Sequence, residues 1–155
     1  MTTSNLTAAQ TALARASAAR ATKQYQQAQT LTVTPGQLVV LMYDGVLRFA
    51  RRARLALAEG KYEAAHNALC RTQDIIAELD ATLDDSAGAI ATNLHRLYEY
   101  CNRRLIEANI TKNADLVGEV ISHFEPLLEA WRVAVATVDE AGKAGNANGV
   151  QVQPK

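Results

Sequence analysis

The sequence predicts an all-α protein, an antiparallel four-helix bundle with an N-terminal arm or a short extra helix. Alanine and leucine are abundant, whereas glycine, proline and aromatic residues are few, a composition typical of helical proteins. Apolar residues recur at spacings of three and four through four segments, which is the period of helices that bury one face. The short connections between these segments predict that sequential helices are antiparallel.

The two ends of the chain differ in composition from the middle. Residues 1–24 are rich in Ala, Thr, Ser and Gln with a weak apolar face, so we expect a flexible N-terminal arm. The helical bundle should occupy residues 25–139. Residues 140–155 contain Gly, Asn and Pro and little that could be buried, which predicts a disordered tail.

The first bundle helix has clear start and stop signals. Pro35 suits the first helical position, and Gly60 can end the helix after Glu59. The second helix is expected over residues 61–83, the third over 87–111, and the fourth from 113 or 115 to 139. Their inward stripes follow bundle spacing, with Tyr62, Ala65, Leu69, Thr72, Ile76, Leu79 and Leu83 in the second, Ile90, Leu94, Leu97, Cys101, Leu105 and Ala108 in the third, and Val117, Val120, Phe124, Leu127, Trp131, Val135 and Val138 in the fourth.

The first helix has more apolar surface than one buried stripe needs. At 100° per residue its apolar arc spans about 260°, and the narrow polar stripe consists of Gln37, Asp44, Arg48 and Arg51. Burial between neighbouring helices or under the N-terminal arm is one explanation. The other is a partner-binding groove along the edge of the arc, near Val40, Tyr43 and Leu47.

Two further features of this helix carry expectations. Gly45 is costly in the middle of a helix, so we expect it to allow close approach of a neighbouring helix. Asp44 precedes Arg48 by four residues, which predicts an ion pair on the helix surface.

The third helix offers candidate anchors for a bound helical peptide. Tyr98, Tyr100 and Ile106 lie off its inward stripe, and exposed aromatic residues often anchor partners. Half-buried packing with a solvated hydroxyl is the alternative for the two tyrosines.

Charge and motif content argue against several functional classes. Sixteen basic residues balance sixteen acidic ones, which does not favour nucleic-acid binding. We also expect no signal peptide and no membrane insertion, because no apolar stretch approaches the roughly 20 residues of a membrane span. These features and the two cysteines, too few for a disulfide framework, predict a cytoplasmic protein.

Catalytic chemistry has little support in the sequence. Glu63 and His66 form a single Glu-x-x-His unit, whereas a di-metal bundle needs two such units and two further carboxylates. Cys101 falls on the inward stripe with Cys70 at the flank of another, where inert thiols are usual. No phosphate-binding loop is present. We therefore expect no enzymatic activity, no metal and no cofactor.

Several motifs together resemble the flagellin-specific export chaperones of the FliS family. The strongest is TPGQLVVLMYDGVLRFARRA over residues 34–53, followed by IATNLHRLYEYCNRRLIEAN over 90–109. TQDIIAELDATLD over 72–84, LLEAW over 127–131 and the upstream QYQQAQ over 24–29 also resemble the family. The resemblance therefore spans residues 24 to about 135.

The resemblance implies a cytoplasmic helical bundle that binds the disordered C-terminal segment of flagellin. Such chaperones prevent premature flagellin polymerisation and aid delivery to a component of the flagellar export gate. By position, Tyr25 matches the tyrosine of the family's N-terminal motif and is the expected partner contact in the arm. Met42 and Cys101 depart from the Leu and Met that are usual at those positions. The candidate partner-binding residues are thus Tyr25, Val40, Tyr43, Leu47, Tyr98, Tyr100 and Ile106.

Two alternatives remain open at the level of sequence. A generic helical adaptor could bind an acidic protein partner through an arginine-rich face made of Arg48, Arg51, Arg52, Arg54, Arg103 and Arg104. A wholly structural role is the third reading. An uncovered apolar face could also be covered by a second copy in a homodimer.

Overall fold

The computed structural model describes residues 33–150, with side chains up to residue 145. Within that range the helices are α2 (Pro35–Ala58), α3 (Tyr62–Ala81), the short 3-10 helix η1 (Asp85–Ala87), α4 (Ala89–Thr111) and α5 (Ala114–Val150). The predicted all-α class and the four predicted bundle helices are confirmed. The expected arm over residues 1–24 and the candidate Tyr25 lie outside the described residues.

The helix ends coincide with residues that suit a turn. α2 begins at Pro35 as predicted, and Gly60, just beyond its end, has a φ of 72°. Gly88 precedes α4 with a φ of 70°. Glycine adopts such positive values without a Cβ clash. Lys112 ends α4 in the same left-handed region, with a φ of 55°, although this conformation costs a residue with a Cβ about 1–2 kcal/mol.

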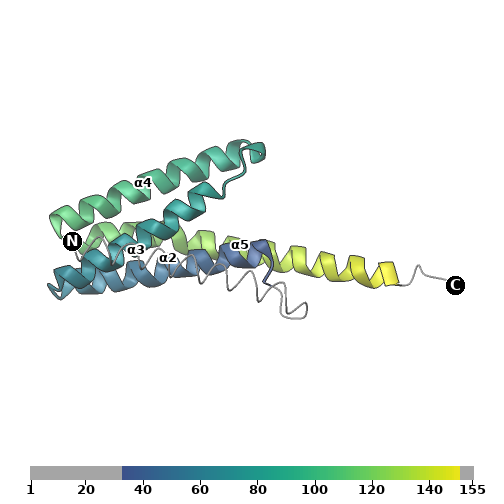
Figure 1. The fold of residues 1–155 in the computed structure, drawn as a ribbon, viewed down its shortest axis with the longest axis horizontal. Coiled ribbons are helices and arrows are strands. Elements are labelled where there is room, and N and C mark those ends of the chain that lie inside the picture. Colours follow the sequence, from purple (N-terminus) through teal and green to yellow (C-terminus); the bar gives the residue numbers. More distant parts are fainter. Residues whose placement is uncertain (1–32, 151–155) are drawn as a thin grey trace, which may run out of the picture. The chain divides into compact units, whose positions relative to one another are not determined.

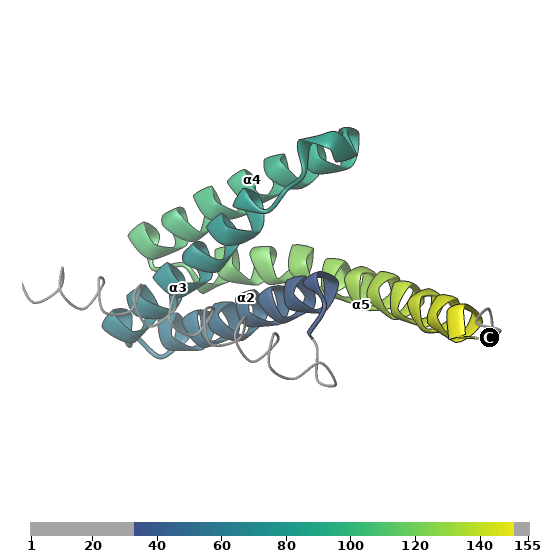
Figure 2. The same cartoon turned by 45° about the vertical axis from the view of Figure 1, so that its right-hand side comes forward.

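Sequential helices of the unit Gly36–Lys155 are antiparallel (Figures 1 and 2). Near the start of α2, Gln37 Nε2 donates to Asp139 Oδ2 at 2.9 Å, while further along α2 Arg51 Nη2 lies 3.0 Å from Glu125 Oε1. α2 and α5 are therefore antiparallel neighbours. α4 packs against both α3 and α5, and contacts described below place α2 between α3 and α5, so that α2 and α4 are diagonal.

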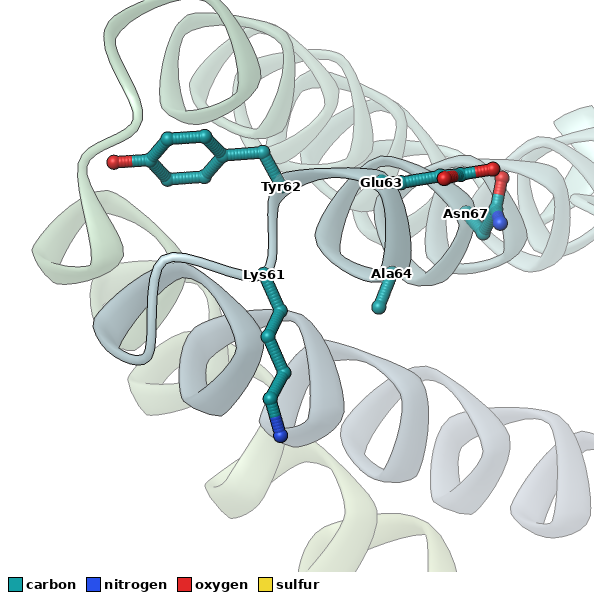
Figure 3. A pocket seen from close by; sticks show the side chains of 5 residues that line it. All are labelled: Lys61, Tyr62, Glu63, Ala64 and Asn67. Atoms are coloured by element: carbon teal, nitrogen blue, oxygen red, sulfur yellow. The ribbon is translucent and has the colours of Figure 1, made fainter.

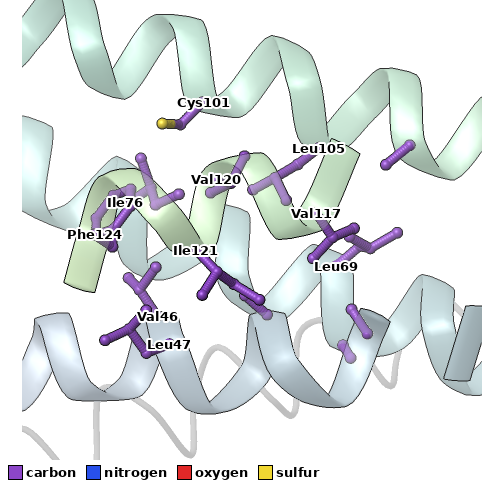
Figure 4. Packing of buried hydrophobic residues seen from close by; sticks show 14 of the residues in the cluster. Val46, Leu47, Leu69, Ile76, Cys101, Leu105, Val117, Val120, Ile121 and Phe124 are labelled. Carbon is purple, nitrogen blue, oxygen red and sulfur yellow. The ribbon is translucent and has the colours of Figure 1, made fainter. Parts of the chain in front are cut away.

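The core lies where the four helices meet (Figure 4). Phe124, Leu69, Leu105 and Val46, one from each helix, are fully buried. Small residues such as Ala53, also fully buried, allow the helices to approach closely. Burying a large apolar side chain contributes about 1.5–3 kcal/mol relative to leaving it exposed, so this shared cluster is the main source of stability.

The fourth helix is longer than predicted. α5 continues to Val150 rather than ending at residue 139, and it projects beyond the other helices in both views (Figures 1 and 2). Residues 140–150 are therefore helical rather than a disordered tail, whereas 151–155 lie outside the described residues. Gly142 and Gly145 each cost about 1 kcal/mol relative to alanine in a helix, but the alanine, glutamate and lysine residues beside them favour helix.

The predicted inward stripes hold in the middle of each helix and fail at some ends. Tyr62 at the start of α3, Ile90 at the start of α4 and Val138 late in α5 are exposed, by 49%, 68% and 69%. Helical periodicity continues to the end of a helix, but a neighbouring helix is required to bury each position. At these three positions no neighbouring helix covers the side chain enough to bury it.

Candidate functional site: the outer faces of α2 and α4

Tyr43 and Leu47 of α2, predicted to border a partner groove, belong to the core. Tyr43 is 0% exposed, and its ring centroid lies 5.4 Å from that of Phe124 and 6.1 Å from that of Trp131 on α5. Leu47 is 2% exposed. The predicted groove at these two residues is wrong because both side chains are buried, Tyr43 of them against α5.

The opposite side of the arc faces α3. A Cβ atom added to Gly45 would lie 3.2 Å from Cδ1 of Ile75, so the predicted close approach is confirmed. The predicted ion pair between Asp44 and Arg48 is not formed. Asp44 Oδ1 instead lies 3.9 Å from Arg132 Nη2 on α5, which leaves Arg48 without its expected partner.

Tyr98 of α4 is also a core residue, contrary to its predicted place on the surface. It is 2% exposed, its hydroxyl is hydrogen-bonded to that of Tyr43, and its ring centroid lies 6.2 Å from that of Phe124. At 100° per residue, Tyr98 lies only about 20° from Leu105 on the helical wheel. The inward face of α4 is therefore wider than the predicted stripe.

Burial governs the ionisation of this central pair. Desolvation raises the pKa of both the Tyr98 and the Tyr43 hydroxyl, because a phenolate loses hydration in the core. The neighbouring Cys101 is fully buried, and burial raises the pKa of its thiol to about 12. These groups are neutral at physiological pH and suit packing rather than chemistry.

Three other predicted contact residues reach the surface to different degrees. Val40 and Tyr100 are half-buried, and Ile106 is 44% exposed. Tyr100 is held in place: its hydroxyl donates to Glu119 on α5, and the Arg104 guanidinium lies 5.7 Å from its ring centroid. This hydrogen bond and the nearby Arg104 lower the pKa of Glu119, so the network joins α4 to α5 as a charged surface feature.

Large apolar side chains do emerge from the bundle, but mostly at positions that were not predicted. They are Val33 before α2, Leu38, Leu41 and Leu55 on α2, Tyr62 on α3, Ile90, Ile106 and Ile110 on α4, and Val133 and Val138 on α5. Leu41 is 57% and Ile110 76% exposed. Leu41 lies at the opposite edge of the apolar arc from Val40, so the wheel indicated an uncovered edge without showing which one.

The outer faces of α2 and α4 lie on opposite sides of the bundle. Tyr43 of α2 and Tyr98 of α4 meet in the centre, while α3 and α5 pack between the two helices. The face of each helix that is turned away from this contact therefore points in opposite directions. Leu38 with Leu41, and Ile106 with Ile110, form one short apolar row on each face.

The predicted arginine face is divided into paired and unpaired side chains. Arg51 pairs with Glu125, and Arg104 Nε lies 2.9 Å from Glu119 Oε2. Arg54 lies against α5 beside Gly118. Arg48 and Arg52 instead surround the ring of Phe49, together with Arg71 of α3, which was not predicted. Arg71 could be assigned to this group only from the packing of α3 on α2.

The Glu63–His66 unit has no further metal ligands gathered beside it in the part of the chain that the structure describes. Within residues 33–150, no three His, Cys, Asp or Glu side chains gather as a metal site requires. A hollow at the turn between α2 and α3 is lined by Lys61, Tyr62, Glu63, Ala64 and Asn67, but Lys61, Tyr62 and Glu63 point in different directions (Figure 3). His66 contacts Asn109 and Cys70 and so ties α3 to α4.

Membrane insertion through a helix has no structural basis in the described part of the chain. None of its helices is both long enough and apolar enough to cross a bilayer.

Comparisons with known proteins agree on one family. Residues 18–138 match the family described as Flagellar protein FliS. The Flagellar secretion chaperone FliS of Bacillus subtilis is 33% identical over 123 residues, covering 78% of this chain and 92% of that protein. The proteins of the same name from Salmonella typhimurium and Campylobacter jejuni are 37% and 38% identical, covering 68% and 70% of this chain and 80% and 85% of their own.

A solved structure shares the fold. It is described as the crystal structure of a flagellar chaperone from bacteria, and it superposes with a TM-score of 0.63 over 76% of this chain and 97% of its own. The sequence identity is 18%, so this likeness supports the helical architecture alone.

Proposed function

The chain belongs to the FliS family of flagellar secretion chaperones, and we propose that it binds the disordered C-terminal segment of newly made flagellin in the cytoplasm. The observation that carries this proposal is the pair of apolar rows on the outer faces of α2 and α4, Leu38 with Leu41 and Ile106 with Ile110. Contiguous exposed apolar surface usually marks an interaction site. The protein acts by binding alone, without catalysis.

The opposed positions of the two rows favour a long, flexible ligand. A segment that covers both faces must pass around the bundle, which a folded partner cannot do without a large concave surface. A disordered segment can wrap in this way because it folds as it binds.

Binding of the flagellin C-terminal segment has a direct consequence for the polymerisation of flagellin. A flagellin segment folded onto the chaperone is unavailable for contacts between flagellin subunits, so premature polymerisation is prevented. Delivery to a component of the flagellar export gate completes the proposed role. Val40, Tyr100 and Ile106 stay candidate contacts, whereas Tyr43, Leu47 and Tyr98 support the faces from within.

Titration calorimetry with a synthetic peptide of the host flagellin's last 40 or so residues tests this proposal. We expect tight binding with a large negative heat-capacity change, as burial of apolar surface requires, and a gain in helical circular dichroism. Absence of binding at high micromolar peptide would refute the flagellin assignment.

Variants on each face locate the binding surface. Leu41→Asp and Ile110→Asp should each weaken peptide binding by about tenfold or more, because each places a charge against apolar contacts. Ala77→Asp, at an exposed position of α3, adds the same charge elsewhere and should leave the affinity unchanged. Equal affinities for all three variants would place the peptide on another surface.

A further inference from the structure

We infer that Arg48, Arg52 and Arg71, gathered around Phe49, form a docking site for acidic side chains of a partner protein segment. This set is called the arginine cluster below. The inference has its own test, since it concerns a charged surface between α2 and α3 that borders the apolar row of α2 at Leu41. It names the chemistry of the partner: carboxylates on a polypeptide.

The arginine cluster is built from two helices around one aromatic ring. The guanidinium carbons of Arg48 and Arg52 each lie 5.3 Å from the centroid of Phe49, and that of Arg71 lies 5.2 Å from it. A guanidinium above an aromatic face is held by the ring's negative face and is only weakly hydrated. Three cationic groups are thereby concentrated on one half-buried side chain.

The cluster lacks the carboxylates that other arginines of the bundle have. Arg51 pairs with Glu125, Arg104 with Glu119, and Arg132 lies near Asp44. Among the described residues, none of the three cluster arginines forms an ion pair. Asp74, one turn beyond Arg71 on α3, is the acidic group closest in sequence; burial raises its pKa, with Arg71 opposing that effect.

Unpaired guanidinium groups in this arrangement are prepared for an anionic ligand. Each retains several N–H donors whose planar geometry matches a carboxylate. The contacts with Phe49 restrict three long side chains before any partner binds, which reduces the conformational entropy lost on binding. The long-range attraction also increases the rate of encounter with an acidic surface.

The surroundings of the cluster favour a polypeptide over a nucleic acid. Leu41 and Leu55 are exposed on the same helix on either side of Phe49, and the 14 positions between them (55 − 41) correspond to about 21 Å. A segment with acidic residues flanked by apolar ones matches this order. Nucleic-acid binding relies on a broad positive surface, whereas this chain has no net charge.

Nuclear magnetic resonance with two short peptides tests the inference directly. The full chain is titrated with hexaglutamate and, as a neutral control, with hexaglutamine, while the arginine side-chain Nε–Hε signals are observed. We expect hexaglutamate to shift the signals of Arg48, Arg52 and Arg71 in a saturable, salt-sensitive manner. No shift with hexaglutamate, or equal shifts with both peptides, would overturn the inference.

Matched variants separate the cluster from general surface charge. Replacing all three cluster arginines by glutamine should weaken hexaglutamate binding by about tenfold, since each exposed charge pair contributes little by itself. Arg103→Gln removes one charge from an exposed arginine of α4 that has no ion pair within the described residues, and it should change the affinity little. A loss of binding free energy in Arg103→Gln equal to one third of the loss in the triple variant would show that only net charge matters, and would contradict a specific site.

Two further experiments test the assignment if the triple variant unfolds or if the cluster binds nucleic acid instead. If circular dichroism shows that the triple variant is unfolded, the single variants Arg48→Gln and Arg52→Gln, both at exposed positions, are titrated instead and should each weaken binding measurably more than Arg103→Gln. A six-residue single-stranded oligonucleotide is titrated in parallel. Tighter binding of this oligonucleotide than of hexaglutamate would refute the assignment to a protein partner.

Discussion

The buried hydroxyls of Tyr43 and Tyr98 join α2 to α4 across the centre of the bundle, and removing them one at a time tests how the core is held together. The two groups are hydrogen-bonded to each other, and the ring of Trp131 packs beside Tyr43 with the ring centroids 6.1 Å apart. Substitution by phenylalanine keeps both rings and removes only an oxygen. The effect on unfolding free energy then depends on which polar groups lose their partners.

The two single substitutions should have similar costs. Tyr98→Phe leaves the buried Tyr43 hydroxyl without its partner and should lower the unfolding free energy by about 1.5 kcal/mol. Tyr43→Phe leaves the buried Tyr98 hydroxyl without its partner and should cost about the same amount. The similarity follows because each hydroxyl is the hydrogen-bond partner of the other.

The double variant should be less destabilised than the sum of the single variants. With both hydroxyls removed, neither is left buried without its partner, so the expected cost is below about 1 kcal/mol rather than about 3 kcal/mol. Urea denaturation followed by circular dichroism measures all three values. Additivity to within about 0.5 kcal/mol would refute the hydrogen-bonded pair.

The same variants distinguish core residues from partner contacts. Because both rings face the interior, the Phe variants should bind the flagellin peptide with unchanged affinity while the protein remains folded. A tenfold loss of affinity without loss of stability would instead show that these tyrosines contact the partner.

Three further predictions concern the ends and surface of the bundle. Lys112→Gly should raise the unfolding free energy by about 1 kcal/mol, because glycine removes the cost of the left-handed backbone at the end of α4; a decrease in urea denaturation would contradict this. The hydrogen bond with Asp80 raises the pKa of His95 above its usual 6.5, so its stabilising contribution is complete below about that value and is lost as pH rises through the raised pKa. An NMR titration of the His95 ring should give a pKa above 6.5, and Asp80→Asn should return that pKa towards 6.5. An unchanged His95 pKa in the Asp80→Asn variant would refute Asp80 as the cause of the shift. Hydrogen exchange should be fast for residues 140–150, because residues 140–145 are exposed along their length; protection equal to that of the core would show that this segment packs against something.

Local features were predictable wherever the local chain decides them. Pro35 and Gly60 marked the limits of α2 because proline and glycine restrict or permit backbone angles independently of the fold. Gly45 predicted a close neighbour because a glycine in mid-helix rarely lacks a packing reason. The end of α5 was mispredicted since Gly142 and Gly145 weaken a helix by amounts that the surrounding residues can offset.

The family also followed from the sequence, because its motifs retain residue types in order and spacing even though each motif is individually weak. By contrast, the candidate contacts were only partly located. Val40, Tyr100 and Ile106 reach the surface, while Tyr43, Leu47 and Tyr98 are buried.

The sequence by itself determined four amphipathic helices, the short connections that make neighbours antiparallel, and a first helix too apolar for a single buried stripe. Only the tertiary structure decided that α5 covers that helix at Tyr43, that Leu47 is buried while Leu41 is exposed, and that α3 brings Arg71 to Phe49. Helical periodicity specifies the angle of each side chain about its own axis. Which angles are covered depends on where the neighbouring helices lie, and that is set by long-range packing of the whole bundle.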